Sequence, residues 1–97
     1  MFPEGVVALH KTRDITKFII QSTCNLALAK INYEKMEFSI LYRLETGKKE
    51  QIVSVCLLEA DQDELVLVLV QNKWGKHMRV FRMEQNKLRE LESHFGN

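Results

Sequence analysis

The residues best able to do chemistry in this chain are basic side chains gathered around its one tryptophan. Between residues 72 and 89 the sequence has six basic residues and one acidic residue, Glu84. A basic stripe with an exposed aromatic side chain can follow a phosphate backbone and stack on a base. This pattern predicts binding of a nucleic acid or a nucleotide, most directly through Lys73, Trp74, Lys76, Arg79 and Arg82.

The competing interpretation of the same segment is a solvated hairpin whose tryptophan folds back into the core. Alternation along a strand places Arg79 on the face of His77 and Phe81, and Arg82 on the opposite face with Val80. The cations therefore cannot all point toward one ligand. Both interpretations remain open from the residues alone.

Other reactive side chains show no pattern typical of a catalytic or metal site. His10, His77 and His94 fall in separate segments, without cysteine or carboxylate residues at the spacing of metal ligands. The glycines are isolated, so no phosphate-binding loop is expected, and no serine lies in a nucleophile elbow. We therefore expect no metal, no cofactor and no enzymatic activity.

Composition indicates an ordinary folded domain. The chain has 97 residues, of which 45% are hydrophobic and 28% charged, and its net charge of +1 gives no general attraction to nucleic acid or membrane. We expect one domain over residues 1–97. Cys24 and Cys56 lie in apolar stretches, which favours buried free thiols over a disulfide or a redox pair. With no basic leader and no apolar run long enough to span a bilayer, the expected location is the cytoplasm, away from membranes.

The first third of the chain is interpreted as an N-terminal segment, residues 1–13, followed by a helix over residues 14–33. Asp14 is a suitable N-cap, and Ile20, Cys24, Leu28 and Ile31 recur at steps of four, four and three. The β-branched residues between 15 and 23 also fit a strand, which is the alternative for part of this segment.

Residues 36–83 predict an antiparallel sheet of four strands. Apolar and polar residues alternate over residues 36–44, and only Leu41 breaks the alternation. A turn at residues 46–49 leads to a strand at 52–58, and the six aliphatic residues 65–70 predict a strand covered on both faces. A turn at residues 72–76 then gives a fourth strand at 77–83.

The chain is predicted to end in a short helix over residues 86–95. Asn86 can cap it, and Leu88, Leu91 and Phe95 recur at helical spacing before Gly96. The predicted fold class is therefore α+β: an N-terminal helix, a four-stranded antiparallel meander curling into a small barrel-like sheet, and a C-terminal helix.

Over residues 26–92 the sequence resembles the WYL domain, a small Sm-like β-barrel of bacterial transcription regulators and phage-defence proteins. The resemblance rests on residues 26–31 before Met-Glu-Phe-Ser-Ile-Leu-Tyr-Arg at 36–43, on Thr46-Gly47, and on Arg-Val-Phe-Arg-Met-Glu at 79–84. The Trp-Tyr-Leu triplet itself is absent. The resemblance implies regulatory binding of a nucleic acid or nucleotide-like ligand, with Tyr42, Arg79 and Arg82 as the matching positions.

Two functions thus follow from the sequence. The first is a small regulatory domain that binds single-stranded nucleic acid or a nucleotide. The alternative is a protein-interaction or self-associating domain. Its partner is then another protein or a second copy of the chain in a homo-oligomer, and that partner covers the apolar strand at residues 65–70.

Overall fold

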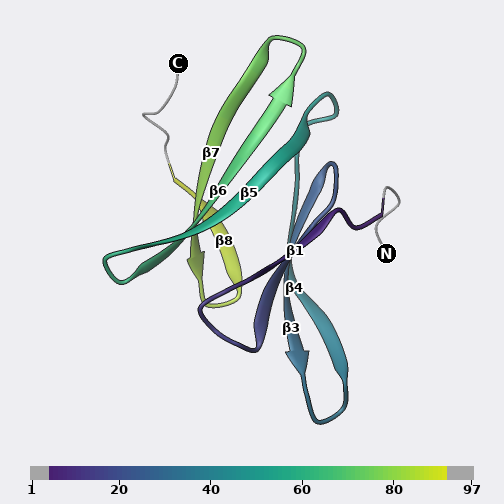
Figure 1. Cartoon of the computed structure of the whole chain (residues 1–97), viewed down its shortest axis with the longest axis vertical. Coiled ribbons are helices and arrows are strands. Elements are labelled where there is room, and N and C mark those ends of the chain that lie inside the picture. The colour runs from purple at the N-terminus through teal and green to yellow at the C-terminus, as the bar shows by residue number, and fades with distance from the viewer. Residues whose placement is uncertain (1–4, 92–97) are drawn as a thin grey trace.

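The computed structural model describes residues 5–91, and these residues form eight strands and no helix. All neighbouring strands are antiparallel and follow one another in sequence order within two four-stranded sheets (Figure 1). The first sheet contains β1 (Ala8–Lys11), β2 (Lys17–Gln21), β3 (Asn25–Asn32) and β4 (Glu37–Glu45). The second contains β5 (Gln51–Ala60), β6 (Asp63–Asn72), β7 (Gly75–Glu84) and β8 (Lys87–Glu90).

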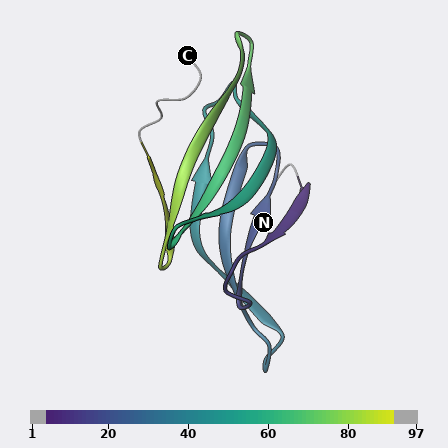
Figure 2. The same cartoon turned by 60° about the vertical axis from the view of Figure 1, so that its left-hand side comes forward.

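The core lies between the two sheets, which pack face to face (Figure 2). Each sheet contributes the side chains of one face, because successive residues of a strand point to opposite faces and cross-strand partners share one. The buried core side chains are Ile19, Leu26 and Leu28 from the first sheet and Ile52, Val66, Val68, Val70, Phe81 and Leu88 from the second.

Hydrogen bonds outside the ladders join the sheets at their margins. The backbone N–H of Arg13 donates to Glu64 Oε2 over 2.7 Å, which satisfies a carboxylate that is only 8% exposed. The N–H of Ile52 donates to the carbonyl of Thr23 over 2.7 Å. The sheets approach most closely where β4 meets β8 and β1 meets β5. They are therefore fixed to each other by polar bonds as well as by apolar packing.

The predicted helix over residues 14–33 is wrong, because this segment forms β2 and β3 and the turn between them. Its apolar residues occupy both faces of the first sheet: Ile19 and Ile20 are neighbours and both are buried. Burial on both faces removes the alternation that distinguishes a strand. The β-branched residues between 15 and 23 favoured a strand, and the structure has β2 in this segment.

The predicted C-terminal helix over residues 86–95 is also wrong in its described part. Residues 85 and 86 form the turn of a hairpin, and Lys87–Glu90 is β8, paired with β7. Leu88 is 2% exposed and packs in the core from this strand. Residues 92–95 of the prediction lie outside the described residues.

The four strands predicted within residues 36–83 are present, but their arrangement differs from the prediction. β4 and β5 do not pair; they belong to different sheets, so the described residues form neither a single meander nor a closed barrel. The segment between β4 and β5 is bound to the first sheet through Thr46, whose backbone N–H donates to the carbonyl of Cys24 over 2.9 Å. The α+β class is therefore corrected to an all-β fold of two antiparallel sheets.

Candidate protein-interaction surface

The residues predicted to bind a ligand do not converge in the structure. Arg79 and Arg82 lie on opposite faces of β7, as the alternation predicted, with Arg79 on the side of the first sheet. Tyr42 is on β4 and packs against the core, so its ring supports the fold. Of the three positions that the WYL resemblance brought forward, Tyr42 and Arg79 face the space between the sheets, whereas Arg82 lies on the far side of the second sheet.

Arg79 is engaged by an acidic neighbour. Its Nε and Nη2 atoms donate to the two carboxylate oxygens of Glu90 on β8, each over 2.7 Å. This paired hydrogen bond raises the pKa of Arg79 and lowers the pKa of the Glu90 carboxyl. A phosphate would have to displace this carboxylate to reach the guanidinium.

Arg82 faces the opposite side of the sheet and is also close to a carboxylate. Its Nε atom is 3.7 Å from Asp63 Oδ2, a distance longer than a hydrogen bond. That nitrogen is buried and has no hydrogen-bond partner among the described residues. The charge of Arg82 is thus partly balanced by an acidic residue on its own face.

Trp74 lies at the exposed tip of the β6–β7 hairpin. It is 80% exposed, so the interpretation as a core plug is wrong. The Nζ atom of Lys73 lies 4.4 Å from the centroid of the indole ring, within range of a cation–π contact. Lys73 also lines a pocket of 330 Å³ together with Lys48 and Lys49 from the connection between the sheets. These two lysines were not singled out from the sequence, although their adjacency in a predicted turn was a usable signal.

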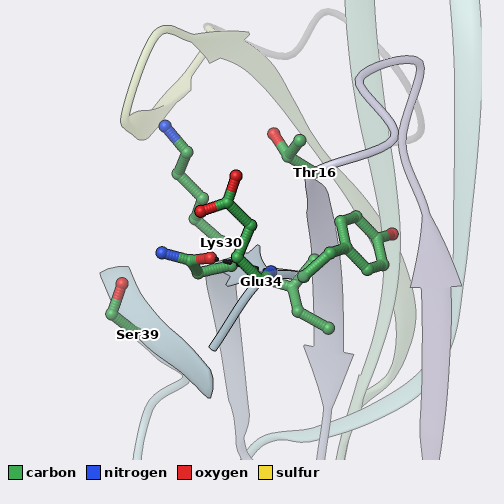
Figure 3. Close-up of a pocket in the computed structure, with 7 residues that line it drawn as sticks. Thr16, Lys30, Glu34 and Ser39 are labelled. Atoms are coloured by element: carbon green, nitrogen blue, oxygen red, sulfur yellow. Dashed lines mark hydrogen bonds between the residues drawn. The ribbon is translucent and has the colours of Figure 1, made fainter. Parts of the chain in front are cut away.

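A second pocket, of 580 Å³, lies beside the β3–β4 hairpin (Figure 3). The side chains of Thr16, Lys30, Glu34 and Ser39 surround it with one positive charge, one negative charge and two hydroxyl groups. Tyr33 also lines it, but its hydroxyl donates to the carbonyl of Ile15 over 2.7 Å. The pocket shows no nucleophile paired with a base.

The outer face of the second sheet, turned away from the core, is a broad apolar surface. Cross-strand pairing places Cys56 and Val80 beside Leu67, and Leu58 beside Leu65. Leu58 is 48% exposed and Met78 is 37% exposed, whereas Val80 is nearly buried. We call this surface the outer face of the second sheet. Its apolar residues are Cys56, Leu58, Leu65, Leu67, Leu69, Met78 and Val80, and it also carries Arg82, the cross-strand partner of Leu65.

The first sheet also has an apolar outer face, on which a second, smaller cluster of hydrophobic side chains lies. Ala27 and Ala29 form its floor, and Phe18 and Ile40 pack against them. The rings of Phe18 and Phe38 meet edge to face with centroids 6.0 Å apart. The outer face of the first sheet consists of Leu9, Phe18, Ile20, Ala27, Ala29, Phe38 and Ile40.

The expectation that residues 65–70 would be covered on both faces is wrong for the chain by itself. Val66, Val68 and Val70 are at most 1% exposed, but the intervening leucines are only partly buried. The alternation of valine and leucine in this run was the available signal for two unlike faces. Both cysteines are free, as predicted, but the prediction that they are buried is wrong: Cys24 is only partly buried, and Cys56 is exposed on the leucine side.

Within residues 5–91 no group of three or more histidine, cysteine or acidic residues is arranged to hold a metal ion. The same residues contain no helix long and apolar enough to cross a membrane. Comparisons with protein-family models, curated proteins and solved structures gave no match. The WYL resemblance therefore stays a prediction, as does the expectation that the chain is not an enzyme.

Proposed function

We propose that this domain is a protein-interaction module that binds through the outer face of its second sheet. The observation that supports this is the apolar surface spread over β5, β6 and β7, with Leu58 and Met78 partly open to solvent. Large contiguous apolar patches on soluble domains are typical of interaction sites. Apolar burial supplies the main driving force for such association.

The proposal is tested by cross-linking from Cys56, which is exposed at this face. In the Cys24→Ser variant, a photoreactive maleimide attached to Cys56 should cross-link the domain to a protein bound at this face. Adding Leu58→Glu should strongly reduce the yield of these adducts. The matched control moves the probe to the hairpin tip in Cys24→Ser/Cys56→Ser/Trp74→Cys. Equal adduct yields from both positions, or no protein adduct from Cys56, would rule the proposal out.

Binding of single-stranded nucleic acid or a nucleotide is the second candidate. It is supported by Trp74, which is 80% exposed, and by Lys48, Lys49 and Lys73 around the neighbouring pocket. The site therefore shifts from Arg79 and Arg82 toward the hairpin tip.

For this second candidate we expect Trp74→Ala to weaken binding of a single-stranded oligonucleotide by about 1–3 kcal/mol, because the indole can stack on a base. Lys76→Glu should lower the salt dependence of binding by about one unit. Fluorescence anisotropy across a salt series measures both effects. Since Trp74 is exposed, the Trp74→Ala variant should melt at the same temperature as the wild type. A wild type with no affinity for the oligonucleotide at low salt would eliminate this candidate.

A further inference from the structure

Three lysines from two separate segments line one pocket of the molecule. Lys48 and Lys49 lie in the connection between β4 and β5, and Lys73 lies in the β6–β7 turn. These two segments are at the same end of the two sheets, opposite the β3–β4 turn (Figure 1 and Figure 2). The pocket has a volume of 330 Å³, and we call it the lysine pocket. The fold thus brings together like charges that are far apart in the sequence.

No carboxylate balances the charges of these lysines. None of the three forms an ion pair with another of the residues 5–91. Glu50 is the one acidic residue among the described residues that line the pocket, and its carboxylate is engaged elsewhere. Its Oε1 atom accepts a hydrogen bond from the N–H of Gly47 over 3.3 Å, and its Oε2 atom is 3.5 Å from His77 Nε2. Like charges held close together repel, and a bound anion removes that cost.

The lysine pocket also has an uncharged donor. The side-chain oxygen of Asn72, which lines the pocket, accepts a hydrogen bond from the backbone N–H of Trp74 over 2.9 Å. This bond fixes which end of the amide is the acceptor and leaves the NH2 group as the donor. Phosphate oxygens accept strong hydrogen bonds from ammonium groups and further ones from neutral N–H groups. The donors of the pocket therefore suit a phosphate group.

An exposed aromatic ring adjoins the lysine pocket. Lys73 lines the pocket, and its Nζ atom is 4.4 Å from the centroid of the Trp74 ring. The Trp74 side chain is 80% exposed, so its ring is accessible to a ligand. A planar base can stack on such an indole. Cations that suit phosphates and a ring that suits a base thus lie at one site.

We propose that the lysine pocket binds the phosphates of a nucleoside di- or triphosphate whose base stacks on Trp74. This inference rests on the second candidate function and names its ligand as a nucleotide rather than a strand. A strand spreads its phosphates along its length, and the cations do not continue as a track, because carboxylates lie against both Arg79 and Arg82. A nucleoside polyphosphate concentrates its charge at one end, as the pocket concentrates its lysines.

Trp74 is the only tryptophan of the chain, so its fluorescence reports a base stacked on it. Titration with ATP in a buffer without divalent cations should quench this fluorescence, and pyrophosphate should compete with ATP without quenching. Lys48→Gln/Lys49→Gln should weaken ATP binding by about tenfold or more, because it removes two charge-assisted hydrogen bonds to phosphate. The control Lys30→Gln/Lys35→Gln removes the same charge near the β3–β4 turn, at the opposite end of the molecule, and should keep the wild-type affinity.

The two cysteines give a second measurement in the wild type. Cys24 is partly buried and lines the lysine pocket, whereas Cys56 is exposed on the outer face of the second sheet. Saturating ATP should slow the reaction of Cys24 with N-ethylmaleimide and leave that of Cys56 unchanged. Mass spectrometry of the labelled peptides measures both thiols in one sample.

The results also separate this inference from the function on which it rests. The nucleotide assignment is wrong if ATP does not bind, if both double variants weaken binding equally, or if saturating ATP leaves the reactivity of Cys24 unchanged. ATP that binds no more tightly than pyrophosphate and quenches no fluorescence would exclude a stacked base, and with it a nucleotide ligand. If a single-stranded oligonucleotide binds and ATP does not, the second candidate function stands and only the ligand is wrong. If neither binds, both fail.

Discussion

Phe81→Ala should destabilise the protein by about 3–5 kcal/mol, as truncation of a buried aromatic residue does. Phe81 is 1% exposed and is among the largest fully buried side chains between the two sheets. A domain of this size typically has only about 5–15 kcal/mol of stability, so this loss takes a large share of it. Chemical denaturation monitored by circular dichroism gives the difference in the free energy of unfolding.

Phe38→Ala is the matched control for this prediction. Phe38 is also a strand phenylalanine, but it is 45% exposed on the outer face of the first sheet. Its truncation removes less buried area and should cost less than half as much. Equal losses for the two variants would mean that the core does not lie between the sheets, and the two-sheet packing would then be wrong.

The sequence predicted a strand most clearly where apolar and polar residues alternate. Over residues 36–44 the alternation is clear, and the structure has β4 there. Even the exception was informative: Leu41 has no cross-strand partner, because Tyr42 pairs with Leu28 and Ile40 with Ala29, so Leu41 forms a bulge. Local alternation therefore predicted the strand but not its two apolar faces, because the bulge turns Ile40 outward and Tyr42 toward the core.

The sequence failed where apolar residues fill both faces of a strand. Residues 26–29 are all fully buried, two in the core and two in the outer cluster. A dense apolar run satisfies helical spacing as easily as strand spacing, and so a helix was predicted there. The assignment of β4 and β5 to different sheets depends on long-range hydrogen bonds such as Ile52 N–H to Thr23 O, which no local pattern specifies.

The candidate surface was only partly predictable for the same reason. The apolar strand at residues 65–70 was predicted to be covered on both faces, and which face is only partly covered could not be assigned without the sheet register. The separation of Arg79 from Arg82 followed from alternation alone. The hydrogen bonds from Arg79 to Glu90 could not be predicted in this way, because they depend on the pairing of β7 with β8.

Leu28→Ala should destabilise the protein by about 2–5 kcal/mol, the range for a leucine truncated in a core. Leu67→Ala should cost at most about 1–2 kcal/mol in the free protein, because Leu67 is partly solvated on the outer face of the second sheet. The two substitutions remove the same atoms from a leucine in a central strand of each sheet. Any difference therefore measures what covers each leucine.

A bound protein separates the contribution of the fold from that of the interaction surface. Leu28→Ala should lower the melting temperature by the same amount with and without the protein captured through Cys56, because the second sheet covers Leu28 within the chain. Under the proposed function, Leu67→Ala should have its larger effect with that protein bound, because the bound protein covers the outer face of the second sheet and binding stabilises the folded state. Calorimetry in both conditions measures this. Equal losses for both leucines in both conditions would place Leu67 inside the fold and remove the basis for an interaction surface on the second sheet.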